Sequence, residues 1–160
     1  MTLRRLASLF ISSAFTFSAF AAENTSTNEQ DLVNNFAEIH QNLMAKVAVA
    51  DMYFGCQLAN QDTPQTSDSI ETLILRTDKD TLGQQLIDCL GEDSIGSDKA
   101  LNYGITGCFS DQTKHLAKQE QQQKMTQVAQ AIESLDKTER QKSFTQCVNN
   151  QALQYLQIEK

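Results

Sequence analysis

Apolar residues recur every three or four positions along most of this chain. The clearest run begins at Asp31 and predicts one helix of about 28 residues, because steps of three and four place side chains on a single helical face. The row consists of Leu32, Phe36, Ile39, Leu43, Val47, Ala50, Phe54 and Leu58. A sustained strand alternation does not occur in any segment of the sequence. The pattern therefore predicts an all-α protein.

The other helices are predicted from the same period and from capping residues. A capping-box spacing at Asp68 predicts a short helix through Arg76, and the same spacing at Asp136 predicts the start of the last helix. Thr77-Asp78 is predicted to cap a third helix that Gly91 ends. We expect only a brief helical turn through Tyr103, a stretch loosened by Gly104 and Gly107, and then one continuous helix over residues 108–135. The predicted fold is a compact bundle of about five to six helices, stabilised by two disulfides.

The first residues have the pattern of a secretory signal peptide, which we place at residues 1–21. Arginines form a positive start, an apolar stretch follows, and Ala19-Phe20-Ala21 fits a cleavage site. The alternative, a membrane anchor, requires a longer apolar stretch of about 20 residues. Residues 22–30 are small and polar and predict a flexible lead, which leaves 31–160 as a single helical domain. We therefore expect the protein in the periplasm or secreted, with no membrane span after cleavage.

Four cysteines in an exported chain favour two structural disulfides, because such compartments are oxidising. If residues 108–135 form one helix, Cys108 lies about 40 Å from the turn at Asp136. Cys147 lies only about 16 Å from the same turn, along the helix that runs back from it. This geometry excludes a Cys108–Cys147 bond, which needs Cα atoms within about 7 Å. The preferred pairing is then Cys89–Cys108 with Cys56–Cys147. The pairing of Cys56 with Cys108 and of Cys89 with Cys147 stays open.

Motifs for catalysis or metal binding are not evident in the sequence. It contains no Cys-x-x-Cys pair, no phosphate-binding loop and no metal-ligand spacing. Cys108, Asp111 and His115 share one face of the predicted helix, but a disulfide beside a helix-supporting polar pair explains them more simply than a nucleophile. We therefore expect a protein that is not an enzyme and that has no cofactor.

The formal charge of −7 is concentrated in the first part of the exported chain. Between Ala22 and Ala100, Asp and Glu strongly outnumber Lys and Arg, whereas the two kinds are nearly balanced from Leu101 onward. This charge argues against nucleic acid and favours a protein partner with a basic cleft. We expect the acidic loop regions to form the partner-binding site. The candidate residues are Asp62, Asp68, Glu92 and Asp93.

Two stretches of the chain resemble a known family. Residues 49–59 (VADMYFGCQLA) and 101–116 (LNYGITGCFSDQTKHL), together with the export signal and the helical plan, are similar to periplasmic immunity proteins that protect bacteria from type VI secretion amidase effectors. The resemblance implies a non-enzymatic toxin inhibitor, often dimeric, that inserts a loop into the toxin's cleft. The alternative function is a periplasmic chaperone or a carrier of a small apolar ligand.

Overall fold

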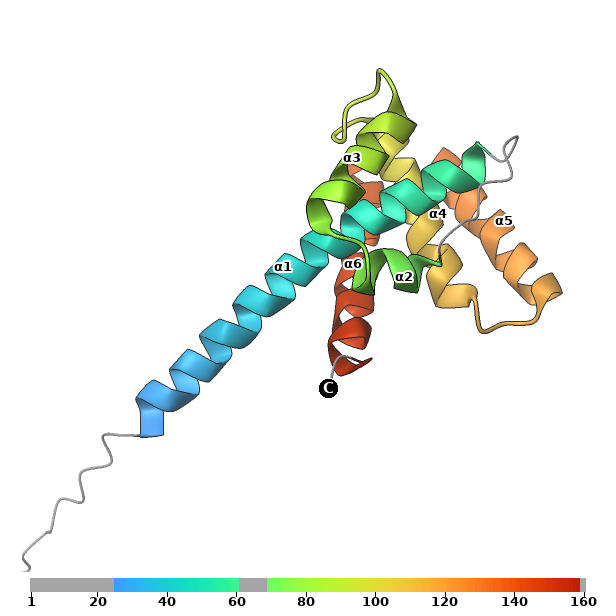
Figure 1. Cartoon of the computed structure of the whole chain (residues 1–160). Coiled ribbons are helices and arrows are strands. Elements are labelled where there is room, and N and C mark those ends of the chain that lie inside the picture. Colours follow the sequence, from blue (N-terminus) through green and yellow to red (C-terminus); the bar gives the residue numbers. More distant parts are fainter. Residues whose placement is uncertain (1–24, 61–68, 159–160) are drawn as a thin grey trace, which may run out of the picture.

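The computed structural model describes residues 25–60 and 69–158, which form six helices and contain no strand (Figure 1). The helices are α1 (Thr25–Ala59), α2 (Ile70–Leu75), α3 (Lys79–Leu90), α4 (Asp98–Thr113), α5 (Lys118–Ser134) and α6 (Lys137–Ile158). The all-α prediction is therefore confirmed. The predicted signal peptide at 1–21 lies outside the described residues.

The helix starts follow from side-chain caps. Asp78 accepts hydrogen bonds from the backbone N–H groups of the first turn of α3, as predicted, and Ser97 caps α4 in the same way. Ser69 caps α2, and its hydroxyl accepts from the backbone of Thr72 at 3.2 Å. The predicted cap, Asp68, lies outside the described residues. α1 already begins at Thr25, so the end of the segment predicted as a flexible lead is helical.

α1 and α4 cross at a close contact that depends on glycine. A Cβ on Gly55 would lie 2.0 Å from the carbonyl oxygen of Tyr103, and one on Gly107 would lie 2.1 Å from that of Asp51. Each helix thus presents a glycine to the other's backbone, and both glycines are buried. The prediction that Gly107 loosens the chain was wrong, because this glycine lies inside α4 and allows the helices to approach.

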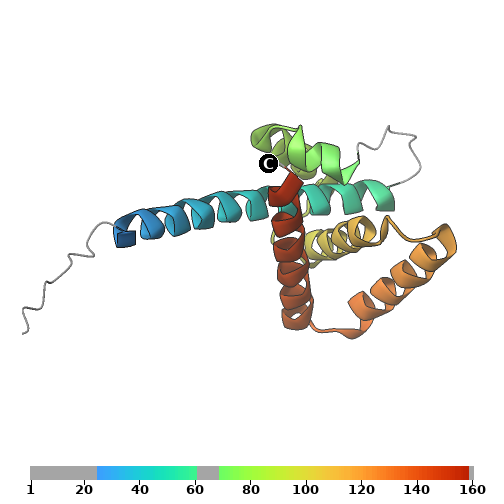
Figure 2. The same ribbon diagram turned by 90° about the horizontal axis from the view of Figure 1, so that it is seen from below.

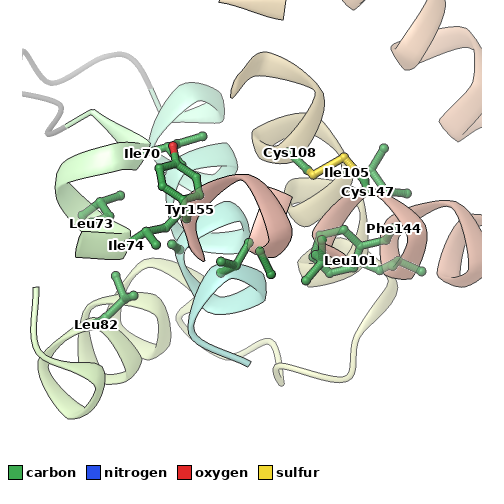
Figure 3. Close-up of a cluster of buried hydrophobic side chains, with 14 residues drawn as sticks. Ile70, Leu73, Ile74, Leu82, Leu101, Ile105, Cys108, Phe144, Cys147 and Tyr155 are labelled. Carbon is green, nitrogen blue, oxygen red and sulfur yellow. A yellow bond between two sulfur atoms is a disulfide. The ribbon is translucent and has the colours of Figure 1, made fainter. Parts of the chain in front are cut away.

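The core surrounds the C-terminal half of α1, which packs against α2, α3, α4 and α6 (Figure 2). Close packing there removes large aliphatic and aromatic side chains from water. Figure 3 shows this cluster, with the Cys108–Cys147 disulfide at one end and Leu82 at the other. Its larger apolar members are Val47, Ile70, Leu73, Ile74, Leu82, Leu101, Ile105, Phe144, Val148 and Tyr155.

The disulfides pair differently from the prediction. Cys56 is bonded to Cys89, and Cys108 is bonded to Cys147, each with Cα atoms 6.3 Å apart. The predicted bonds Cys89–Cys108 and Cys56–Cys147 are therefore wrong, and so is the alternative pairing. The first bond ties α1 to the end of α3, and the second ties α4 to α6.

The error in pairing comes from one break in the helix predicted over 108–135. α4 ends at Thr113, and α5 begins at Lys118 in a new direction (Figure 2). Lys114 and Leu116 close tight turns on the preceding carbonyl groups, and Ala117 has an extended conformation with φ −59° and ψ 145°. Because the chain turns here, α6 returns beside α4 and brings Cys147 to Cys108.

None of the described helices combines the length and the apolar character that a membrane span needs.

Candidate functional site

The acidic residues predicted to bind a partner are only partly within the described chain. Asp62 and Asp68 lie outside the described residues. Glu92 and Asp93 are exposed in the connection between α3 and α4, where the Asp93 carboxylate forms an ion pair with Lys99 at 2.8 Å. A shallow hollow of about 380 Å³ lies beside the end of this connection, at Gly96 and Ser97. Glu92 and Asp93 are neighbours on this exposed connection, and neither lines the hollow at Gly96 and Ser97.

The face formed by Cys108, Asp111 and His115 is not a nucleophilic cluster in the structure. Cys108 is buried in a disulfide, and His115 is exposed beyond the end of α4. Asp111 instead forms an ion pair with Lys114 at 2.8 Å. The disulfide in the simpler explanation from the sequence agrees with this arrangement, but the carboxylate of Asp111 pairs with Lys114 and not, as predicted, with His115.

In the described part of the chain, the N-terminal stretch of α1 is largely exposed. Residues 29–42, here called the α1 arm, project beyond the other helices (Figures 1 and 2). Leu32, Val33, Phe36 and Ile39 lie on the arm with 55% to 71% of their surface exposed. The apolar row predicted from the sequence includes Leu32, Phe36 and Ile39, but periodicity identifies an apolar face and not the element that covers it. A row of exposed apolar side chains is typical of an interaction site.

The α1 arm is also acidic. Glu29, Asp31 and Glu38 are its charged residues, and all three are exposed. Asp31 and Glu38 are seven residues apart, two helical turns, so they lie on the same side of the helix beside the apolar row. The arm contains no Lys or Arg. It therefore presents an apolar stripe flanked by negative charge.

A second apolar surface is a groove of about 410 Å³ between α4, α5 and the start of α6, here called the α4–α5 groove. α5 packs mainly against α4 and buries none of its residues fully, so the wall that it forms stays partly open. The apolar lining residues are Ile105, Phe109, Leu116, Val128, Ala131, Ile132 and Leu135. Several of these were predicted as one continuous helical stripe, and the break at 114–117 turns that stripe into two facing walls.

The charge of the α4–α5 groove is opposite to that of the arm. Lys124 and Arg140 line the groove, and none of the residues described as lining it is Asp or Glu. Arg140 is anchored by Asn102 and by an ion pair with Asp98 at 3.2 Å. Lys124 is therefore the cation that the groove exposes, because the Arg140 side chain is only 11% exposed and its charge is offset by Asp98.

A buried polar cluster joins the three main helices of the core. The side-chain amide of Gln151 in α6 donates to Asp51 of α1 at 3.2 Å and to Asp111 of α4 at 3.0 Å. The Tyr155 hydroxyl donates to Asp111 at 3.3 Å, and Lys114 pairs with the same carboxylate. One oxygen of Asp51 is buried without a hydrogen-bond partner. Neither of the two hollows described above is lined by these residues.

Burial shifts the pKa of two groups in this cluster, Asp51 and Tyr155. It holds the pKa of the Asp51 carboxyl well above its usual range; the hydrogen bond from Gln151 opposes this effect, and the charge of Asp111 adds to it. Burial, the nearby Asp111 charge and the hydrogen bond to Asp111 likewise raise the pKa of the Tyr155 hydroxyl. Asp51 thus links α1 to α6 through Gln151 while burial favours its protonated form, and the sequence gives no signal for this role.

The two stretches that resemble immunity proteins lie mainly in α1 and α4, the pair of helices that cross at Gly55 and Gly107. Comparison with known proteins found no matching family model, no matching curated protein and no matching solved structure. The resemblance therefore remains a prediction, and the function is inferred from the surfaces of this chain.

Proposed function

We propose that this chain is an exported, non-enzymatic binding domain that recognises a protein partner through the α1 arm. The observation that carries the proposal is the exposed apolar row on a helix that projects from the bundle. Leu32, Phe36 and Ile39 have the i, i+4, i+7 spacing by which a helix anchors itself in an apolar groove. The rest of the chain acts as a scaffold, which two disulfides tie together.

Charge further defines the partner. The exposed Asp31 and Glu38 beside the apolar row favour a groove with a basic rim, since complementary charge orients and speeds association. Glu92 and Asp93 lie in a separate exposed connection and add negative charge to the first part of the chain. A toxin with a basic cleft, located in the periplasm, is a partner of this kind, and we propose toxin neutralisation as the biological role.

Comparison of matched bait proteins tests this proposal. The oxidised protein and a Leu32→Ser, Phe36→Ser variant are used to capture proteins from periplasmic extract at low and moderate salt. A control variant, Asn34→Ser with Gln41→Ser, changes the other side of the same helix. We expect one protein to bind the wild type and the control but not the apolar-row variant, and its activity to be inhibited on binding. Equal capture by all three baits, or no capture, would contradict the proposal.

A second candidate function is the carriage of a small apolar ligand. The observation that favours it is the α4–α5 groove, whose volume of about 410 Å³ lies in the range of small-molecule sites. Binding of an apolar dye to the native monomer, abolished by Ala131→Trp in the groove wall and unaffected by Leu32→Ser with Phe36→Ser, would support this candidate over the first.

A further inference from the structure

The two unpartnered apolar surfaces of the molecule complement each other. The α1 arm carries an apolar row beside carboxylates, and the α4–α5 groove has apolar walls beside the exposed Lys124. The other cation in the lining, Arg140, is largely buried and already pairs with Asp98 of its own chain. Within residues 25–60 and 69–158, both surfaces are exposed. We propose that the α1 arm of one copy docks in the α4–α5 groove of a second copy. This inference rests on the proposed function, because the same arm serves as the recognition element.

The arm cannot fill the groove of its own chain. α1 is one continuous helix from Thr25 to Ala59, and its C-terminal half is fixed in the core by Val47, Ala50 and the disulfide at Cys56. The arm leaves one side of the bundle, while α5 lies on the other side (Figures 1 and 2). A helix of this stiffness cannot fold back across the bundle, so the occupant is an arm from another copy.

The chemistry of the two surfaces supports this docking. Leu32, Phe36 and Ile39 supply anchors on one helical face, and Phe109, Val128 and similar residues supply apolar walls that receive them. The groove has no carboxylate in its described lining, so an acidic helix enters without meeting like charge. Pairing two arms with each other is disfavoured instead, because both carry only acidic charges.

The contact is heterologous, since an arm meets a groove rather than an identical patch. Two copies can exchange arms and close into a dimer, or successive copies can form a longer chain. In either arrangement each copy has one arm and one groove. Because the two surfaces differ, each can be disrupted by its own variant, and the two variants can then be mixed.

Mixing two complementary variants tests the arm-and-groove contact. The arm variant is Leu32→Ser with Phe36→Ser, and the groove variant is Ala131→Trp, which fills the groove with its own side chain. The molar mass of each oxidised protein is measured by sedimentation over a range of concentrations. We expect the wild type to associate. The dissociation constant of each variant alone should be at least about tenfold higher than that of the wild type. The equimolar mixture should form a one-to-one pair, because the groove variant supplies an intact arm and the arm variant an intact groove.

Two further measurements keep the result interpretable. Circular dichroism and the thermal midpoint of each variant at low concentration show whether the fold is retained, which we expect because Leu32 and Phe36 are exposed and Ala131 lies at the groove. Lys124→Glu should also weaken association, and added salt should weaken that of the wild type.

Several outcomes would overturn the inference. They are a wild type that remains monomeric up to about 1 mM, an arm variant that associates like the wild type, a mixture that does not pair, and a monomer purified with a small apolar molecule in the groove. If the wild type stays monomeric while arm-dependent capture of another protein succeeds, this inference fails and the proposed function stands.

Discussion

Gly107 of α4 faces the backbone of Asp51 in α1, and an added Cβ at Gly107 would lie 2.1 Å from the Asp51 carbonyl oxygen. Backbone atoms on both sides cannot move aside as a flexible side chain can. The distance between α1 and α4 is therefore set by the absence of a side chain, and the same contact positions Asp51 in the buried polar cluster.

Gly107→Ala should destabilise the fold, because the two helices must separate to admit one methyl group. We expect the free energy of unfolding to fall by about 2–3 kcal/mol, the upper part of the range for overpacked cores. Gly83→Ala is the matched control, since nothing lies within 4 Å of a Cβ at this position in α3. The control should gain about 0.5–1 kcal/mol from its higher helix propensity. Urea unfolding of both variants measures the difference, and equal effects would argue against the close contact.

Asp51→Asn should remove a pH dependence of stability. The pKa of Asp51 is raised in the folded protein, so the folded state retains a proton that the unfolded state loses. The stabilising contribution of the neutral acid is complete below the ordinary pKa of an aspartate, and it decreases as pH rises toward the folded pKa. The amide that replaces the carboxyl in the variant stays neutral at every pH. Relative to wild type, the variant should therefore become more stable as pH rises above about 4.

The measurement for Asp51 is the difference in unfolding free energy between wild type and variant at several pH values. Asp88→Asn, which changes an exposed carboxylate in α3, is the control and should show a much flatter difference. Asp111, Lys114 and Tyr155 are the other ionisable groups of the cluster, and they are present in both proteins. A flat difference for Asp51→Asn would show that its carboxyl is ionised in the folded state.

Peptide mapping without reduction should recover two linked pairs, Cys56 with Cys89 and Cys108 with Cys147. In the chain-entropy model, each loop of this length contributes roughly 4 kcal/mol to stability. Replacing Cys108 and Cys147 together by serine should therefore lower the free energy of unfolding by about this amount. A peptide that joins Cys89 to Cys108 would contradict both bonds of the structure.

Amide hydrogen exchange should be faster in α5 than in α4. α5 buries none of its residues fully, whereas α4 buries Leu101, Ile105 and Cys108 and is tied to α6 by a disulfide. Local opening of α5 exposes little apolar surface, so it costs less free energy than opening α4. Mass spectrometry of peptides from the two helices measures the rates. Equal protection of both helices would indicate that α5 is integrated into the core.

Much of the local structure could be predicted from the sequence. The three- and four-residue period identified the helical class, and Asp78 and Asp136 correctly marked the starts of α3 and α6, because a cap acts on the backbone within its own first turn. The presence of two disulfides also followed from the sequence, given four cysteines in a chain with an export pattern.

The cysteine pairing and the exposure of the apolar row depend on contacts between residues far apart in the sequence, and these follow only from the tertiary structure. The break after Thr113 contains neither glycine nor proline, so no local signal marked it, and the cysteine pairing depended on it. Leu32 and Phe36 continue the same apolar row as the buried Val47, yet they are exposed. Periodicity determines which side of a helix is apolar, whereas the packing of distant segments determines whether anything covers that side. The candidate binding surfaces, the α1 arm and the α4–α5 groove, arise from the packing of distant segments.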